Sequence, residues 1–236
     1  MSREKKLKKK KKFRFKKFFI FMLFLAIIIT VILNVFSFKI KNINVTGNKI
    51  YTDTQIIEKA KLSNYPSFLT TSSILMEIKL EKDPLIKKAV VKKSFWAVIN
   101  IKITEYQSYF ITNKNVLVLE GGRTVKMKDL SVDVEAPLLT SDLTTVIYNK
   151  LLKAFSKIDP SIITEISEIE YTPSALDKGR FLFLMTDGNY AYVTLINIKS
   201  INYYSKIVTQ LAGQKGIINF DSYRSGDAGI TIDILN

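Results

Sequence analysis

The sequence of 236 residues contains no cysteine and no histidine. Without cysteine, the chain cannot form disulfides, cysteine-ligated zinc sites, thiol nucleophiles or cysteine-linked lipids. Without histidine, it has no imidazole base, which excludes a Ser-His-Asp triad and a histidine-ligated metal. These two absences remove much common enzyme chemistry before any motif is sought.

The motifs of other catalytic classes are also incomplete. A penicillin-binding enzyme needs Ser-x-x-Lys, Ser-x-Asn and Lys-Thr-Gly together; here Ser-x-x-Lys occurs only at 2–5, Ser-x-Asn at 200–202, and Lys-Thr-Gly is absent. Glycine-rich phosphate loops and Gly-x-Ser-x-Gly are missing as well. The neighbouring carboxylates Glu165, Glu168 and Glu170 are interpreted as the wet side of an amphipathic segment. We therefore expect a non-enzymatic protein without catalytic, cofactor-binding or metal-binding residues.

Positive charge is concentrated at the N-terminus. The formal net charge is +15, and residues 1–17 contain eleven Lys or Arg and one acid, Glu4. Such a tail could bind nucleic acid, or it could be a topology signal that also contacts anionic lipid headgroups. Because an apolar run follows directly, we favour the second interpretation and expect membrane lipids, and no nucleic acid, as its partners.

Residues 18–38 form 21 positions without a charge, of which only Thr30, Asn34 and Ser37 are polar. A helix of this length reaches about 31 Å, close to the hydrocarbon thickness of a bilayer. A buried core helix and a cleaved signal peptide are the alternatives, but the run is long for either and ends without a small-x-small cleavage pattern. We expect an uncleaved single-pass anchor with residues 1–17 in the cytoplasm and 39–236 outside.

Residues 39–106 show the order strand, helix, helix, strand, strand. Residues 38–45 predict a strand that ends at Gly47-Asn48, and Thr52 to Gln55 form a capping box for a helix over about 53–62 with Ile56, Ile57 and Ala60 inward. Ser72 and Ser73 cap a second helix to about Lys82, with Ile74, Leu75 and Ile78 inward and Asp83-Pro84 as its stop. Strands are predicted over 86–93 and 97–105, the latter with alternating isoleucines.

Residues 107–236 predict a second, mixed β-rich domain with two amphipathic helices, so the fold class is α+β. A meander covers 109–112, 116–120 and 123–128, and 181–194 form a hairpin whose Asp187-Gly188 pair predicts a type I′ turn. Asp187 is interpreted as a turn residue. Strands close the chain at 217–223 and 229–235, after a helix over about 199–212. Ser141 is expected to cap the other helix, whose core face is formed by Leu143, Ile147, Leu151, Ala154 and Ile158.

Several of these segments resemble the FtsQ/DivIB family of bacterial cell-division proteins. The family patterns "I-x-V-x-G-N" and "P-x-I-x-x-A-x-V" occur at 43–48 and 84–91, in the POTRA domain of that family. Residues 98–105 are similar to its "L-x-I-x-V-x-E-R-x-P", with Glu105-Tyr106-Gln107 in place of Glu-Arg-x-Pro. Trp96 stands where the family often has proline. In the second domain, 136–140, 185–189, the pair Tyr203-Tyr204 and 216–219 are similar to DivIB, in the family's order.

The resemblance implies a divisome scaffold at the division septum. Such a protein binds DivIC/FtsB-like and FtsL-like partners and regulates septal peptidoglycan synthesis by FtsW/FtsI-like synthases. Partner contact is implied for a strand near the C-terminus, where an open sheet edge accepts a strand from another protein. The residues assigned to this contact are Phe220, Ser222, Tyr223, Arg224, Ser225 and Ile230. The alternative is a membrane-anchored chaperone or transport accessory protein that carries a POTRA domain.

Overall fold

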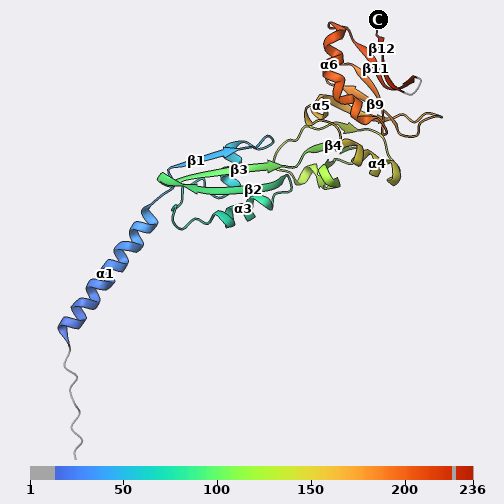
Figure 1. The fold of residues 1–236 in the computed structure, drawn as a ribbon. Helices are drawn as coiled ribbons and strands as arrows, with labels where there is room; N and C mark the ends of the chain where they lie inside the picture. Colours follow the sequence, from blue (N-terminus) through green and yellow to red (C-terminus); the bar gives the residue numbers. More distant parts are fainter. Residues whose placement is uncertain (1–13, 225–226, 236) are drawn as a thin grey trace, which may run out of the picture. The chain divides into compact units, whose positions relative to one another are not determined.

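The computed structural model describes residues 14–224 and 227–235 (Figure 1), with the backbone alone at 36, 37, 222–224, 227 and 228. The predicted basic tail lies largely outside these residues. The chain divides into two compact units. The first runs to Asn48 and includes Thr52–Lys82 and Lys88–Ile103, and the second contains Lys49–Tyr51, Asp83–Lys87 and the chain from Thr104 onward.

The apolar run forms the helix α1 (Phe15–Ser37). This helix is long and apolar enough to cross a membrane, and none of its most apolar window is buried. Two of its polar side chains form hydrogen bonds to backbone oxygens within the helix. The Thr30 hydroxyl donates to Ala26 O (2.8 Å), and the Asn34 amide donates to Thr30 O (2.8 Å). Such internal pairing is what a polar group needs in hydrocarbon, where water is absent.

The first unit has the predicted order of elements. A three-stranded sheet has the order β1-β3-β2, with β1 parallel to β3. The buried side chains of the two helices and of β3 form its core: Ile56, Met76, Leu80, Ile99, Ile101 and Ile103. The elements are β1 (Asn42–Thr46), α2 (Asp53–Lys59), α3 (Ser73–Glu81), β2 (Ile86–Ser94) and β3 (Val98–Glu105).

The helix caps of this unit confirm the sequence prediction. Thr52 Oγ1 accepts from Gln55 N (3.3 Å) while Gln55 Oε1 accepts from Thr52 N (2.9 Å), so both bonds of the capping box are present. Ser72 Oγ caps α3 by accepting from Leu75 N (3.4 Å). Each cap thereby satisfies one first-turn N–H group that has no acceptor within its own helix, that of Gln55 in α2 and that of Leu75 in α3.

The face that α3 buries differs from the prediction. Ile74, Leu75 and Ile78, which were expected inward, are exposed, whereas Met76 and Leu80 are buried. The cause lies in two glutamates of α3. Glu77 Oε1 accepts from Val91 N (2.7 Å) and Glu81 Oε1 accepts from Ala89 N (3.0 Å). These bonds tie the helix to the outer edge of β2 and thereby fix its rotation.

Residues that directly adjoin the POTRA resemblance segments meet around Glu105. Its Oε2 accepts from Lys49 N (2.8 Å) and Ile50 N (2.9 Å), and its Oε1 accepts from Tyr51 N (3.2 Å). The Tyr51 hydroxyl donates to Asp83 Oδ1 (2.8 Å). Burial, then the hydrogen bond and negative charge of Asp83, raise the pKa of Tyr51 far above its ordinary value. Glu105 is thus the acceptor that the loop after β1 needs.

The second unit is a nine-stranded sheet in the order β12-β11-β10-β9-β8-β7-β4-β5-β6. The helices α4 (Thr145–Phe155), α5 (Pro160–Glu165) and α6 (Tyr204–Val208) contribute to its buried cluster. 3₁₀ turns at Ile198–Tyr203 and Thr209–Leu211 flank α6. The strands are β4 (Ser108–Thr112), β5 (Val116–Leu119), β6 (Thr124–Lys126), β7 (Leu138–Leu139), β8 (Ile166–Tyr171), β9 (Arg180–Met185), β10 (Tyr190–Thr194), β11 (Gly216–Arg224) and β12 (Asp227–Ile234).

Two local predictions in this unit need correction. Thr144, and not Ser141, caps α4 by accepting from Ile147 N, because Ser141 Oγ accepts from Tyr171 N instead (2.9 Å). The turn of the β9–β10 hairpin is not type I′, since only Gly188 has a positive φ (87°). Gly188 N donates to Met185 O (3.0 Å), as expected for a three-residue loop whose last residue is left-handed. The core stripe of α4 is confirmed.

Candidate partner-binding edge

The strand β12 forms one margin of the nine-stranded sheet, and it pairs with β11 on one side only. The sequence prediction assigned partner contact mainly to the end of the preceding strand, with Ile230 of β12 as a further residue. In the structure that strand, β11, lies between β10 and β12: residues 217–219 pair with β10, and β12 pairs along the other edge. The margin of the sheet at this end is therefore the outer edge of β12.

The register of β11 and β12 shows which backbone groups point to that edge. Leu235 N donates to Lys215 O (2.9 Å), and the same register pairs Ile217 with Asp233 and Ile218 with Ile232. Hydrogen-bonded and non-hydrogen-bonded pairs alternate along an antiparallel ladder. The main-chain N–H and C=O groups of Ile232 and Ile234 therefore point away from β11, toward the margin of the sheet.

Three isoleucines line β12 at every second position. Ile230, Ile232 and Ile234 are 40%, 38% and 50% exposed. Ile232 lies opposite the buried Ile218, so this row continues the core-facing side of the sheet past the last fully covered strand. An incoming strand would find both unpaired backbone groups and an apolar row to cover. Ile232 and Ile234 were missed by the sequence prediction, although their period of two in the last strand was a visible signal.

The predicted contact residues fall in three different settings. Phe220 is 1% exposed and belongs to the core of the second unit, which places it beneath the edge. Ile230 is exposed on β12. The backbone of Ser222, Tyr223 and Arg224 lies in the last part of β11, opposite Gly229, Ala228 and Asp227, but their side chains lie outside the described residues. Ser225 lies outside them altogether.

A polar cluster holds the start of β11 against the β9–β10 hairpin. The Tyr204 hydroxyl donates to both carboxylate oxygens of Asp187 (2.8 and 2.9 Å), and Asn189 Nδ2 donates to Asp187 Oδ2 (2.9 Å). Asn189 Oδ1 then accepts from Gly216 N (2.8 Å). The three resemblance segments 185–189, 203–204 and 216–219 thus meet at one point. Asp187 acts as a structural acceptor, in agreement with its interpretation as a turn residue.

The electrostatics of this cluster follow from the same bonds. Partial desolvation opposes ionisation of Asp187, but hydrogen bonds from Asn189 and Tyr204 and the positive charge of Lys215 outweigh it and lower the pKa of Asp187. Burial, followed by the bond to Asp187, raises the pKa of Tyr204 well above its ordinary value. Asp187 is therefore ionised and Tyr204 neutral near pH 7, the combination in which the hydroxyl donates to a carboxylate.

A second brace lies between β9, β10 and β11. Arg180 Nε donates to Asp221 Oδ2 (2.5 Å), and the Arg180 guanidinium stacks over the Tyr192 ring at 3.6 Å from the centroid. Asp221 lies where the register between β11 and β12 shifts, between Asn219 and Ser222. The brace therefore fixes β11 at the irregular position from which its last residues, Ser222 to Arg224, extend.

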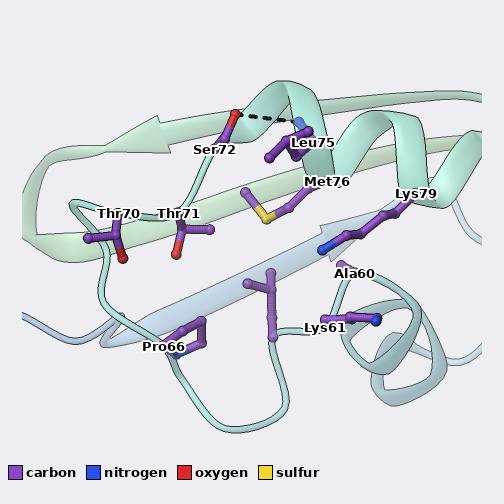
Figure 2. Close-up of a pocket in the computed structure, with 10 residues that line it drawn as sticks. Ala60, Lys61, Pro66, Thr70, Thr71, Ser72, Leu75, Met76 and Lys79 are labelled. Atoms are coloured by element: carbon purple, nitrogen blue, oxygen red, sulfur yellow. Dashed lines mark hydrogen bonds between the residues drawn. The ribbon is translucent and has the colours of Figure 1, made fainter. Parts of the chain in front are cut away.

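Figure 2 shows a hollow of about 210 Å³ in the first unit, between the end of α2, the following loop and α3. Lys61 and Lys79 border it from two sides, and the hydroxyl groups of Thr70, Thr71 and Ser72 lie on its rim. No carboxylate lines it. It therefore lacks the paired acids that glycosidase chemistry requires.

Comparisons with known proteins identify the architecture. A family model for the POTRA domain, FtsQ-type, matches residues 38–106. The cell division protein DivIB of Brevibacillus brevis is 30% identical over 200 residues, which cover 82% of this chain and 75% of that protein. DivIB of Bacillus subtilis is 30% identical over 204 residues, with 83% and 76% covered. The solved extracytoplasmic domain of DivIB from Geobacillus stearothermophilus is similar with 19% identity and a TM-score of 0.37, over 46% of this chain and 96% of that one.

A long apolar helix near the N-terminus, an FtsQ-type POTRA domain and a β-rich unit together define a class of membrane-anchored bacterial cell-division proteins. Within this class, the chain belongs to the DivIB family. Its role is accordingly in cell division. The predicted family and the predicted α+β fold class are confirmed.

Proposed function

We propose that the chain is a non-enzymatic scaffold of the division machinery that binds DivIC/FtsB-like and FtsL-like partners at the septum. Through them it regulates septal peptidoglycan synthesis by FtsW/FtsI-like synthases. Residues 1–17 form a cytoplasmic tail that contacts anionic lipids, 18–38 cross the membrane, and the POTRA domain (39–106) and β domain (107–236) lie outside. The family membership, the long apolar helix and the basic residues before it support this arrangement.

The observation that carries the partner site is the margin formed by β12. It offers outward main-chain groups at Ile232 and Ile234 beside a half-exposed apolar row. Adding a strand there satisfies the backbone groups and covers the isoleucines, which is the usual source of affinity in β-augmentation. Ser222, Tyr223, Arg224 and Ser225 are proposed as further contacts, with Phe220 as their buried support.

Two other sheet margins, those of β2 and β6, are less suited to strand addition. At the outer strand of the first unit, the Val91 and Ala89 amides already donate to Glu77 and Glu81. The strand β6, at the far margin of the large sheet, is only three residues long, whereas β12 has eight. Covered and very short edges are the ways in which proteins prevent unwanted pairing.

A proline substitution tests strand addition at β12. Ile232→Pro removes an outward N–H group and places a ring at the margin, whereas Ile232→Ala shortens the same side chain and keeps the N–H. Loss of one hydrogen bond and the steric conflict should weaken binding of the DivIC/FtsB-like partner by roughly tenfold or more relative to Ile232→Ala. Titration of the partner's extracytoplasmic segment against full-length protein in detergent measures this. Equal affinities of the two variants would exclude the β12 edge.

The contribution of Tyr223 is tested separately. Tyr223→Glu introduces a charge at the proposed surface and should reduce partner capture by roughly thirtyfold if Tyr223 is a central contact. Tyr223→Phe, which keeps the ring, is the matched control. Unchanged capture by Tyr223→Glu would remove this residue from the site and leave the β12 edge in place.

A fluorescent fusion of the protein should form a ring at midcell. Uniform membrane fluorescence would instead favour a chaperone or transport accessory protein.

A further inference from the structure

The turn between β2 and β3 carries two aromatic side chains in water. Phe95 and Trp96 are 93% and 83% exposed. Trp96 (φ 64°) and Ala97 (φ 60°) adopt left-handed backbone conformations that cost non-glycine residues about 1–2 kcal/mol each. Two large, exposed apolar side chains at a strained turn indicate a surface that is covered by another apolar phase or partner.

Hydrogen bonds tie this tip to the chain that leaves α1. Lys41 N donates to Ala97 O (2.9 Å), and β1 starts with Asn42 beside Val98, the first residue of β3. Lys39 is the first charged residue after the apolar run. From Lys39 to Lys41 an extended chain covers at most about 7 Å, which is comparable to the 5–8 Å depth of the interfacial zone on each side of a bilayer. The tip is therefore held close to the membrane surface, whatever the tilt of the helix.

The neighbouring loop supplies further apolar groups at the same end of the unit. Phe68 N donates to Phe38 O (2.8 Å), Ser67 Oγ donates to Val35 O (2.6 Å), and the Phe38 and Phe68 rings meet edge to face at 6.0 Å. Leu69 is exposed beside them in sequence. These contacts bring the loop that contains 66–71 to the point where the chain emerges from α1.

Basic side chains accompany the apolar groups. Lys93 Nζ lies 4.6 Å from the centroid of the Phe68 ring and donates to Thr71 O (2.6 Å). Lys39, Lys41 and Lys92 are exposed nearby in the chain. Aromatic rings next to lysines are typical of the lipid–water interface, where rings lie at headgroup level and lysines attract anionic phosphates.

We propose that the tip Phe95-Trp96, together with Phe38, Phe68 and Leu69, inserts into the interface of the membrane that α1 crosses. This surface is called the interfacial tip. It seats the POTRA domain on the outer leaflet, so that the domain has a second attachment besides the covalent one through α1. The inference rests on the membrane-anchored arrangement proposed above, and it assigns to Trp96 a lipid contact.

The chain contains a single tryptophan, so its fluorescence reports on the interfacial tip alone. Full-length protein is reconstituted into vesicles of phosphatidylcholine and phosphatidylglycerol, with and without brominated acyl chains. We expect Trp96 emission to shift to shorter wavelength than in the unfolded chain, to lose intensity in brominated lipid and to resist quenching by aqueous iodide. Water-like emission, quenched by iodide and unaffected by bromine, would overturn the proposal.

A relocated tryptophan is the matched control. The double variant Trp96→Phe, Lys49→Trp moves the probe to the exposed loop beyond the other end of β1. Circular dichroism verifies that it folds. Its emission should be water-like and accessible to iodide. Bromine quenching of equal size at both positions would also overturn the proposal, because it would show that the whole domain lies against lipid and that the tip has no special contact.

Failure of this inference is distinguishable from failure of the proposed function. If Trp96 remains in water while the midcell ring and partner binding persist, only the interfacial tip is wrong. If protease treatment of intact cells leaves 39–236 undigested until the membrane is broken, the proposed topology is wrong. The wild-type protein carries the probe, so the first measurement needs no substitution.

Discussion

At the scale of single residues, Tyr204 and Asp187 show how the polar residues of the second unit act. The Tyr204 ring is buried, but its hydroxyl reaches a carboxylate that is exposed to solvent. Tyr204→Phe keeps the ring and removes the donor. A hydrogen bond to a charged group is worth about 1.5–3 kcal/mol, and the exposure of Asp187 reduces this to about 1 kcal/mol. Chemical denaturation of the two proteins at pH 7 should show this loss in the free energy of unfolding.

The same pair has a pH signature. Because the pKa of Asp187 is lower in the folded protein than its ordinary value of 3.8, the carboxylate stabilises the fold above that value. This contribution is lost as the pH falls through the lowered pKa. The difference between wild type and Tyr204→Phe should therefore be full at pH 5–7 and shrink toward pH 3. A difference that stays constant over this range would show that the hydroxyl acts by packing and not through the carboxylate.

At the scale of single elements, α3 shows where sequence prediction succeeds and where it fails. The caps at Thr52 and Ser72 were predictable, because a cap depends on residues three positions apart. The buried face of α3 was not, because its nine residues include apolar side chains in most directions. The choice was made by Glu77 and Glu81, whose partners Val91 and Ala89 are distant in the sequence. Helix caps could be predicted from neighbouring residues, whereas hydrogen bonds between residues distant in the sequence could not.

The partner edge illustrates the same limit. The two last strands were predictable from their composition, but hydropathy carries no direct information on which strand lies at the margin of a nine-stranded sheet. For this reason the predicted contact residues lie mostly in or next to β11, with only Ile230 on β12, and do not include Ile232 and Ile234, which the structure places at the margin. The meeting of Asp187, Tyr204 and Gly216 is equally invisible in sequence spacing, since it depends on how the hairpin, α6 and β11 are packed.

The role of Glu77 at the edge of β2 can be tested by substitution. Glu77→Leu removes the acceptor of the Val91 amide, whereas Glu77→Gln keeps an oxygen at the same position. A buried amide without a partner costs about 1–3 kcal/mol, so the leucine variant should be less stable by that amount and the glutamine variant close to wild type. Chemical denaturation measures both. If the two variants lose stability equally, then charge is required, and the hydrogen bond to the edge is not what matters.

At the scale of the whole molecule, the parts have separate physical tasks. Two-thirds of the net charge of +15 lies in residues 1–17, so the remainder is an ordinary surface. The helix α1 is long and apolar enough to cross a membrane. The hydrophobic cluster of the second unit runs from Tyr109 to Phe220 and includes no residue of the first. Two units with separate cores can unfold separately, and calorimetry can resolve their two unfolding transitions.

The whole-molecule prediction is that the two cores melt as two transitions that respond to different substitutions. Phe155 is fully buried in the second unit and Leu80 is fully buried in the first. Phe155→Ala and Leu80→Ala each remove buried volume and should cost about 3–5 and 2–5 kcal/mol, enough to lower a melting temperature by on the order of 10 °C. Calorimetry of the full chain in detergent should show Phe155→Ala moving one transition and Leu80→Ala the other. If each substitution moves both transitions equally, the two units unfold as one cooperative body, and the separate cores do not confer separate stability.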